Sequence, residues 1–433
     1  MSYKSYEDYK DSGVEWIGEI PKNWKISSIK ELYQYRSEKV TDKVFKPLSV
    51  TKQGIVPQLE NAAKTDNNDN RKKVKKGDFV INSRSDRKGS CGVSNYEGSV
   101  SLIYHVLEPN FSYFIKYGHH LFRSMMFAEE FYKWGHGIVD DLWSTQYNEM
   151  KKIKIPHPSS EECILISKFL DKETNEINQN IDKNNELISL LEEKKVALIN
   201  ETLIKGCSSK KFITFQIDIL NQEFEVSENN QLLKLGYLLK TKITDGPHET
   251  PEFIDEGYPF LSVDSIVDGK LNFEGCRYIS EEDFNKYKLK CNPQRDDVFM
   301  GKAASIGKVA IVDVDLEFSI WSPLALLRPD KEKILPKFLE YSLKAQYVQD
   351  QVDLFATSNT QKNISMGDIP RIQIFVPSLS SQIKIIEYLE KKIYNLNMSI
   401  NQIQQQNELL EEYKQSLIHH AVTGKIDVRE VEV

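Results

Sequence analysis

One internal repeat constrains the fold of this 433-residue chain more than any other feature. The segment that begins at Ile153 recurs from Ile372, 219 positions later, and the match needs no gap. Further matches are Pro158-Ser159 with Pro377-Ser378, Leu190-Leu191-Glu192-Glu193 with Leu409-Leu410-Glu411-Glu412, and Leu198-Ile199 with Leu417-Ile418. Solenoid repeats have periods of about 20–50 residues, so a period this long indicates a duplicated half-molecule. We therefore predict two related halves with a pseudo-twofold internal repeat.

Each copy of the repeat carries a heptad pattern that predicts a long helix. The seam residues follow one another in alternating steps of four and three, as in a coiled coil. They are Ile177, Ile181, Asn184, Ile188, Leu191 and Leu198 in the first copy, and Leu396, Ile400, Ile403, Asn407, Leu410 and Leu417 in the second. Because one chain carries both copies, we expect the helices to pair with each other in antiparallel orientation. The alternative is that each helix packs on a separate core.

Polar residues refine this prediction. Asn184 and Asn407 fall on the seam, where a buried amide costs stability but fixes the register. Ser159 and Glu162 have the spacing of a capping box at the start of the first helix. A seam of about 26 residues would be roughly 40 Å long.

The rest of the sequence divides around these helices. In residues 22–155 and 231–374, short apolar runs are broken by Gly, Pro, Asn and Asp, which indicates strand-rich segments. The expected regions are an N-terminal segment with the first globular domain (1–157), a first long helix (158–206), a junction with the second globular domain (207–376), a second long helix (377–424) and a tail (425–433). The predicted fold class is therefore α+β, with two strand-rich domains separated by an antiparallel helix pair.

The net charge of −7 conceals an uneven distribution. Residues 22–155 contain 23 Lys and Arg against 15 Asp and Glu, whereas residues 231–374 contain 18 against 22. Contact with a polyanion must therefore come from local basic patches rather than from the net charge. The sequence has neither an apolar run long enough to cross a bilayer nor a legible secretory signal, so we expect a cytoplasmic protein.

Basic residues suited to phosphate contact concentrate in short segments. Residues 71–76 hold five positive charges in six positions, and 83–90 form a polar, basic loop. Residues 302–308 and 358–362 occupy comparable places in the second half. The candidates for polyanion binding are Lys72, Lys73, Lys75, Lys76, Arg84, Arg87, Lys88, Lys302, Lys308, Gln361 and Lys362. For each of them, the alternative is a solvated surface charge.

No known catalytic motif fits the sequence. The segment from Gly301 to Lys308 superficially resembles a phosphate-binding loop, but five residues separate its glycines instead of four, and Val309 replaces the Ser or Thr that binds magnesium. His119-His120 and His419-His420 are adjacent pairs, which cannot both face one metal from a regular helix. The five cysteines are scattered, without a C-x-x-C pair, which indicates reduced thiols. We expect a non-catalytic chain without a metal site.

Several motifs resemble those of the specificity subunits of type I restriction-modification enzymes. Residues 9–24 (YKDSGVEWIGEIPKNW) resemble the N-terminal signature of that family. Residues 48–51, 77–82, 98–101 and 104–107 look like one type of its target-recognition domain, and residues 244–251 (TDGPHETP) and 258–262 look like another. Together with the two half-repeats and residues 421–427, the resemblance covers essentially the whole chain.

The resemblance implies a non-catalytic reader of double-stranded DNA, in which the two globular domains are target-recognition domains for the two halves of a bipartite target. The implied partners are two modification (methyltransferase) subunits and two ATP-dependent restriction subunits. S-adenosylmethionine, ATP and magnesium would belong to these partners, and the complex would methylate adenine at N6 and cleave DNA. A spacer of roughly 40 Å is close to one turn of duplex, about 34–36 Å. Because the two domains differ in sequence, we expect an asymmetric target.

The sequence also departs from the family pattern. Residues 207–230 do not repeat the opening signature, and Asp296 stands where the first half has Gly77. A competing hypothesis is a coiled-coil adaptor whose globular heads bind proteins or glycans, which explains the acidic total charge more easily. Salt dependence separates the two hypotheses, because phosphate binding weakens steeply between low and moderate salt.

Overall fold

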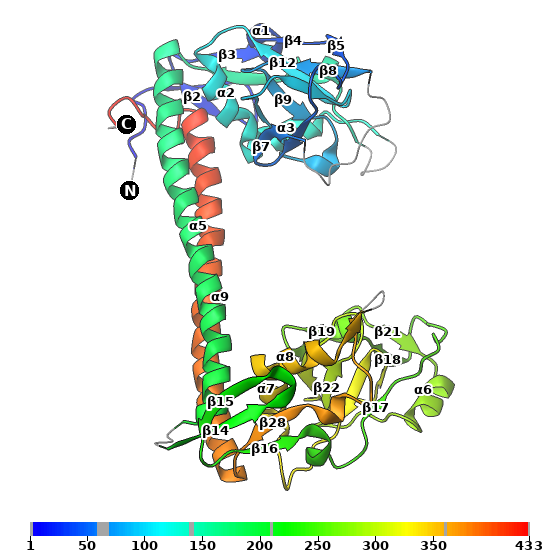
Figure 1. Cartoon of the computed structure of the whole chain (residues 1–433). Coiled ribbons are helices and arrows are strands. Elements are labelled where there is room, and N and C mark those ends of the chain that lie inside the picture. The colour runs from blue at the N-terminus through cyan, green and yellow to red at the C-terminus, as the bar shows by residue number, and fades with distance from the viewer. Residues whose placement is uncertain (1–2, 59–68, 138–142, 208–210, 359–361, 432–433) are drawn as a thin grey trace. The chain divides into compact units, whose positions relative to one another are not determined.

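The computed structural model describes residues 3–58, 69–137, 143–207, 211–358 and 362–431. These residues form two compact units, unit 1 (Met1–Asn185 with Ile403–Val433) and unit 2 (Glu186–Gln402). Both divisions between the units fall inside the long helices α5 (Ser160–Lys205) and α9 (Leu379–Val422), which are labelled in Figure 1. The mixture of many small sheets with two long helices confirms the predicted fold class.

Unit 1 is built on a four-stranded antiparallel sheet. Its strands, in spatial order, are β10 (Cys91–Val93), β9 (Phe79–Asn82), β12 (Tyr104–Pro109) and β4 (Tyr33–Tyr35). All four residues of β9 are buried, and its aromatic and β-branched side chains suit a strand that is covered on both faces. Helices α2 (Phe114–Arg123) and α3 (Met125–Lys133) contribute Phe114, Phe122 and Phe127 to the same core as Phe79.

Smaller elements complete unit 1. The strands are β1 (Tyr9–Asp11), β2 (Glu19–Pro21), β3 (Lys25–Ser28), β5 (Lys39–Val40), β6 (Leu48–Thr51), β7 (Gly54–Pro57), β8 (Arg71–Val74), β11 (Gly98–Val100) and β13 (Lys154–His157), and the short helices are α1 (Ile29–Leu32), η1 (Ser85–Arg87) and α4 (Tyr147–Met150). Strand β13 pairs with β3 and leads directly into α5. The start of the long helix is thereby anchored to the globular part of its own unit.

Unit 2 repeats this plan with different sequences. Its main sheet has the order β17 (Thr244–Asp245), β25 (Leu324–Leu327), β22 (Val298–Gly301) and β23 (Val309–Ile311). The other strands are β14 (Phe212–Ile217), β15 (Gln222–Ser227), β16 (Gln231–Lys234), β18 (Tyr258–Leu261), β19 (Ile266–Val267), β20 (Lys270–Leu271), β21 (Arg277–Ile279), β24 (Ser319–Ile320), β26 (Thr357–Ser358), β27 (Lys362–Asn363) and β28 (Gln373–Val376). The helices are η3 (Asp218–Leu220), η4 (Leu235–Leu238), η5 (Val263–Ser265), α6 (Glu281–Lys288), α7 (Pro336–Lys344), α8 (Gln346–Phe355) and η6 (Ile369–Arg371). Strand β28 pairs with β16 and leads into α9, as β13 leads into α5.

The turn before the central strand is the same in both units. The buried carboxylate of Asp78 accepts a hydrogen bond from the backbone N–H of Lys75 (2.7 Å), and that of Asp297 accepts one from Gln294 (2.8 Å). Both donor and acceptor positions differ by 219 residues, so the repeat extends into the globular parts. Asp296 takes a positive φ of 75° where Gly77 has 94°, because Asp tolerates the left-handed region better than most residues. The missing glycine therefore leaves the turn intact.

An arginine side chain forms hydrogen bonds with each of these carboxylates, but the arginine follows a different strand in each unit. In unit 1, Arg36 follows β4 and bonds to Asp78 from two nitrogen atoms (2.7 and 3.0 Å). In unit 2, Arg328 follows β25 and bonds to Asp297 in the same way (2.8 and 2.7 Å). The arginine–carboxylate pair therefore has the same geometry in both units, although the arginine comes from a different position in the chain.

The helices α5 and α9 lie side by side within each unit and run antiparallel (Figure 1). In unit 1 the side-chain amide of Asn184 donates to that of Asn407 (2.8 Å), and Lys414 donates to Asn178 (3.0 Å); in unit 2, Lys195 donates to Asn397 (3.4 Å). All twelve seam residues named above are buried or half-buried. The amide pair sits on the seam, where a mismatch of register would leave it without partners.

The junction between the two halves, residues 207–230, does not repeat the sequence of residues 9–24, but it also contains a hairpin. Strands β14 and β15 pair as a hairpin, as β1 and β2 do in unit 1. The second strand of each hairpin is followed by a similar turn, in which the N–H of Trp24 donates to the carbonyl of Pro21 and that of Asn230 donates to Ser227 (2.9 Å each). The junction therefore keeps a hairpin at this place, although its strands are longer and its loop is shorter than in unit 1.

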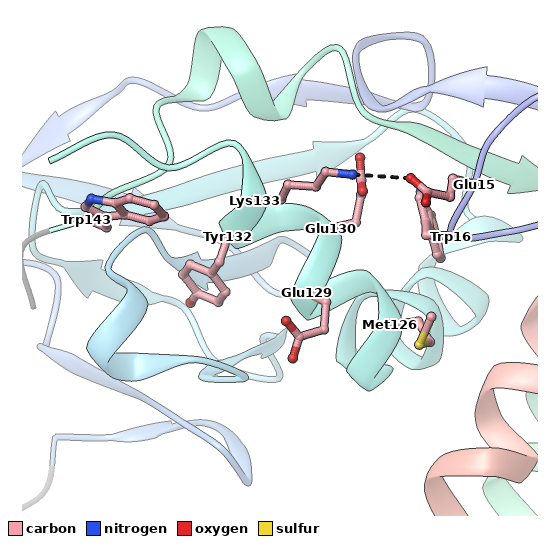
Figure 2. A pocket seen from close by; sticks show the side chains of 8 residues that line it. All are labelled: Glu15, Trp16, Met126, Glu129, Glu130, Tyr132, Lys133 and Trp143. Atoms are coloured by element: carbon pink, nitrogen blue, oxygen red, sulfur yellow. Dashed lines mark hydrogen bonds and ion pairs between the residues drawn. The ribbon is translucent and has the colours of Figure 1, made fainter. Parts of the chain in front are cut away.

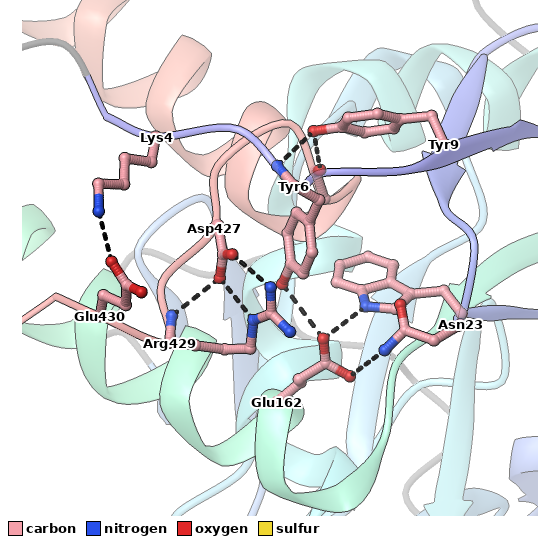
Figure 3. Close-up of polar contacts among 10 residues, drawn as sticks. Lys4, Tyr6, Tyr9, Asn23, Glu162, Asp427, Arg429 and Glu430 are labelled. Atoms are coloured by element: carbon pink, nitrogen blue, oxygen red, sulfur yellow. Dashed lines mark hydrogen bonds and ion pairs between the residues drawn. The ribbon is translucent and has the colours of Figure 1, made fainter.

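Residues from both ends of the chain converge on Glu162 and its surroundings in unit 1 (Figure 3). The buried carboxylate of Glu162 accepts hydrogen bonds from the Trp24 indole (2.9 Å) and the Tyr6 hydroxyl (3.3 Å). Glu162 also exchanges hydrogen bonds with Ser159, and these bonds confirm the predicted capping box. The hydroxyl of Tyr9 donates to the carbonyl of Gly424 (3.0 Å), so residues that follow α9 complete the core of unit 1.

Candidate nucleic-acid interface

The polar loops predicted from the sequence are joined to a second segment in each unit. In unit 1 the backbone N–H of Thr145 donates to the carbonyl of Ser83 (2.9 Å). In unit 2 the N–H of Ile364 donates to the carbonyl of Lys302, also at 2.9 Å. Both donor and acceptor positions differ by 219 residues. Each unit therefore presents one composite surface, made of the loop after the central strand and the segment that precedes the strand leading into the long helix.

A second contact extends this match. Isolated bridges join Arg84 to Ser144 in unit 1 and Ala303 to Asn363 in unit 2, again at equivalent positions. The residue types predict the two loops but not their pairing. The signal for it was present in the spacing of 219 residues, which continues beyond the segment where the residue types still match. The two units therefore share the backbone pairing of the composite loop surface, while the side chains on that surface differ.

In unit 1 this surface is basic and accessible. Arg84 and Arg87 both approach the carboxylate of Asp86, at 3.1 and 3.5 Å, and their side chains are 40% and 68% exposed. Lys88 forms an ion pair with Glu129 and is 41% exposed. The three predicted cations of this loop therefore lie where a phosphate or a base edge can reach them.

The basic run at residues 71–76 divides into buried and exposed members. Lys72 lies on β8 with its ammonium bonded to the Tyr35 hydroxyl (2.6 Å) and to two backbone carbonyls, and burial lowers its pKa to about 8. Lys73 pairs with Glu38 at 3.0 Å and is only 16% exposed. Lys75 and Lys76 are exposed. The structure thus argues against Lys72 as a phosphate contact, because it would have to give up three hydrogen bonds.

The candidates of unit 2 divide in the same way. Lys302 is 9% exposed and lies 3.1 Å from the carboxylate of Asp245, so it does not fit the prediction of a phosphate contact either. Lys308 donates to the carbonyl of Ile266 (3.3 Å), whereas Lys362 is 61% exposed and pairs with Asp353 (3.2 Å). Gln361 lies outside the described residues.

One concave surface in unit 1 has a different character. A pocket of about 530 Å³ is lined by Glu15, Trp16, Met126, Glu129, Glu130, Tyr132, Lys133 and Trp143. Figure 2 shows Lys133 directed at Glu15, and the two atoms of this ion pair are 3.4 Å apart. Three carboxylates against one ammonium make this pocket unsuited to phosphate.

The adjacent histidines of unit 1, His119 and His120, are held by local contacts. His120 bonds to Asp171 (2.9 Å), and burial lowers the pKa of the neighbouring His119 to about 3, so this imidazole is neutral. Among the residues that the structure describes, no group of His, Cys, Asp and Glu is arranged to hold a metal ion. Over the same residues, no helix has both the length and the hydropathy needed to span a bilayer.

Comparison with known proteins agrees with this geometry. The family model described as "Type I restriction modification DNA specificity domain" matches residues 221–411. The putative type I restriction enzyme MjaX specificity subunit of Methanocaldococcus jannaschii is 24% identical over 95% of this chain and 96% of its own length. The type I restriction enzyme EcoBI specificity subunit of Escherichia coli is 22% identical over 50% of this chain and 46% of its own length.

Solved structures share the fold. One, from work on complex assembly and conformational transition of the type I R-M system, superposes with a TM-score of 0.69 at 15% identity, over 94% of this chain and 99% of that chain. The HsdS subunit from Thermoanaerobacter tengcongensis superposes with a TM-score of 0.50 at 16% identity, over 94% and 98%. Nothing in these matches favours the adaptor hypothesis. The chain is therefore similar to the specificity subunits of type I restriction-modification systems, by the domain model that matches residues 221–411 and by its full-length relatives, and it shares the fold of these solved structures.

Proposed function

We propose that this chain is the DNA-recognition subunit of a type I restriction-modification complex, and that each unit reads one half of a bipartite target in double-stranded DNA. The observation that carries the proposal is the composite loop surface, which recurs at the same spacing in both units. The exposed loop residues in unit 1 include Arg84 and Arg87, and the equivalent positions in unit 2 are Ala303 and Ile306. The same backbone arrangement with different side chains in the loop supports recognition of two different half-sites.

The chain itself supplies binding and orientation, and its partners supply the chemistry. In this proposal two modification subunits hold S-adenosylmethionine and methylate adenine at N6, and two restriction subunits use ATP and magnesium to move along and cleave DNA. Adenine in duplex DNA must leave the base stack before a methyltransferase can reach it, so the specificity subunit has to hold the flanking duplex while the partner extrudes the base. Exposed cations such as Lys75 and Lys76 suit this role, because phosphate contacts fix the position of a protein on the duplex.

The test is co-expression with the modification subunit encoded beside this chain in a host without other adenine methylation, followed by genome-wide mapping of N6-methyladenine. We expect an asymmetric motif of two parts with a fixed gap, and its loss when this chain is omitted. A soluble complex with the modification subunit that leaves the genome unmethylated would contradict the proposal.

A further inference from the structure

One buried carboxylate in unit 2 gathers three basic side chains. Asp245 is 6% exposed, and its oxygen atoms lie 2.5 Å from the ammonium of Lys290, 3.1 Å from that of Lys302 and 3.1 Å from Nε2 of His248. Lys302 is buried, whereas Lys290 is 51% and His248 70% exposed. Two ammonium groups share one carboxylate, so the cluster has excess positive charge even with a neutral imidazole. This is notable in a half whose net charge is negative, since residues 231–374 hold 18 basic against 22 acidic side chains.

The fold fixes the backbone position of Asp245. Asp245 ends β17, which pairs with the buried strand β25, and the next residue, Gly246, lies against the carbonyl of Ile320. A Cβ atom on Gly246 would come within 1.7 Å of that oxygen, so no other residue fits there without moving the backbone. Lys290 also donates to the carbonyl of Gly246 (2.9 Å). Its ammonium has three protons, and two of them are used by these contacts, which leaves the third for an anion.

The cluster is also continuous with the composite loop surface of unit 2. The backbone carbonyl of Lys302 accepts from Ile364, and the side chain of Lys302 bonds to Asp245. The loop 302–308 and the segment at 362–364 are therefore tied to the TDGPHETP segment, which the sequence resemblance singled out without a role. Lys302 acts here as a buried counter-ion that joins the two, and the exposed basic side chains are Lys290 and His248.

The corresponding position in unit 1 carries the opposite charge. Leu107 pairs with Tyr35 as Leu326 pairs with Thr244, so Asp245 stands where unit 1 has Arg36. The side chain of Arg36 forms an ion pair with Asp78. In unit 2 the carboxylate equivalent to Asp78 is Asp297, and it pairs with Arg328, which follows another strand. The shared frame therefore does not need Asp245, and its contacts are specific to unit 2.

We propose that Lys290 and His248 form a phosphate-binding site for the DNA backbone in unit 2, and that Asp245 is the residue that positions both. The inference rests on the proposed function and deepens it. A phosphate oxygen takes the remaining proton of the Lys290 ammonium, and the exposed imidazole of His248, which shares the Asp245 carboxylate, is the second group of the site. The two contacts fix the register of the duplex and carry no base specificity.

The experiment measures the affinity of the purified complex with its modification subunits for a duplex that contains the mapped target, as a function of salt. Removal of one phosphate contact reduces the slope of log K against log salt by about 0.9, which corresponds to about a fivefold loss of affinity at roughly 0.15 M salt. We expect this loss for Lys290→Gln, equally on target and non-target duplexes. The matched control is Lys286→Gln, which removes the same charge from an exposed pair with Glu249 in the same unit.

A wild-type slope for Lys290→Gln, or equal slopes for both variants, would overturn the inference while leaving wild-type target binding, and hence the proposed function, in place. The positioning role is tested by Asp245→Asn combined with Lys302→Met, since Asp245→Asn alone would leave Lys302 buried without its counter-ion. If the double variant remains folded by thermal melting, it should show the reduced slope of Lys290→Gln. A folded double variant with the wild-type slope would refute the role of Asp245.

Discussion

Replacement of Glu162 by alanine should destabilise unit 1 far more than a typical surface substitution. The side chain of Glu162 is 5% exposed and accepts hydrogen bonds from Tyr6, Asn23, Trp24 and Ser159 (Figure 3). The variant leaves the fully buried indole N–H of Trp24 and the buried hydroxyl of Tyr6 without an acceptor, at about 1–3 kcal/mol each. It also removes one half of the capping box, the bond from the Ser159 N–H to the Glu162 carboxylate, which contributes about 0.5–1 kcal/mol, whereas Ser159 still caps the N–H of residue 162. We expect unit 1 to lose roughly 3–5 kcal/mol.

The assay is urea denaturation of the full chain, followed by tryptophan fluorescence and far-ultraviolet circular dichroism. With a slope of about 2 kcal/mol per molar urea, the transition of unit 1 should move to lower urea by roughly 2 M, while that of unit 2 stays in place. The control is Glu161→Ala, which changes the same residue type at the exposed neighbouring position. A shift below about 1 kcal/mol, or one equal to that of the control, would refute the reasoning.

Three further predictions follow from the geometry. The hydrogen bond from His120 holds the pKa of Asp171 at about 2, below the unfolded value of about 3.9. The ionised Asp171 carboxylate therefore stabilises the fold above about pH 4, and this stabilisation is lost as the pH falls through 2. The loss of unfolding free energy caused by Asp171→Asn should shrink over that range in urea titrations. Lys75→Gln should reduce the salt slope of DNA binding by about 0.9, whereas Lys72→Met should leave the slope unchanged; the reverse order would contradict the assignment of exposed and buried cations. Asp296→Gly should keep the stability of unit 2 within about 0.5 kcal/mol, and Asp296→Val should lower it by about 1–2 kcal/mol in thermal melts, because only the second change is strained at positive φ.

The helices and the duplication could be predicted from the sequence because both depend on periodic patterns. The seam from Ile177 to Leu198 follows from local spacing alone, and its antiparallel partner follows from the presence of a second copy. The hairpin at 212–227 could not be found this way, since its residues no longer match residues 9–21. Backbone hydrogen bonding preserved the turn after the side chains had diverged.

The candidate site was predicted less well, because charge in a sequence does not reveal burial. Lys72 and Lys302 are as basic as Arg87 in the sequence, but each lies in a place where tertiary contacts supply an internal partner. The role of Lys290 depends on Asp245, which is 45 residues away in the chain, and no local pattern joins them. Long-range pairing of this kind becomes visible only in the folded chain.

The most direct test of the central claim is the methylation map of a complex in which Arg84 and Arg87 of unit 1 are both changed to alanine. If each unit reads its own half-site through its composite loop surface, the bases required in one half of the motif should relax or change. The other half and the gap between them should stay as in the wild type. A map in which both halves change together, or in which neither changes although methylation continues, would contradict the account.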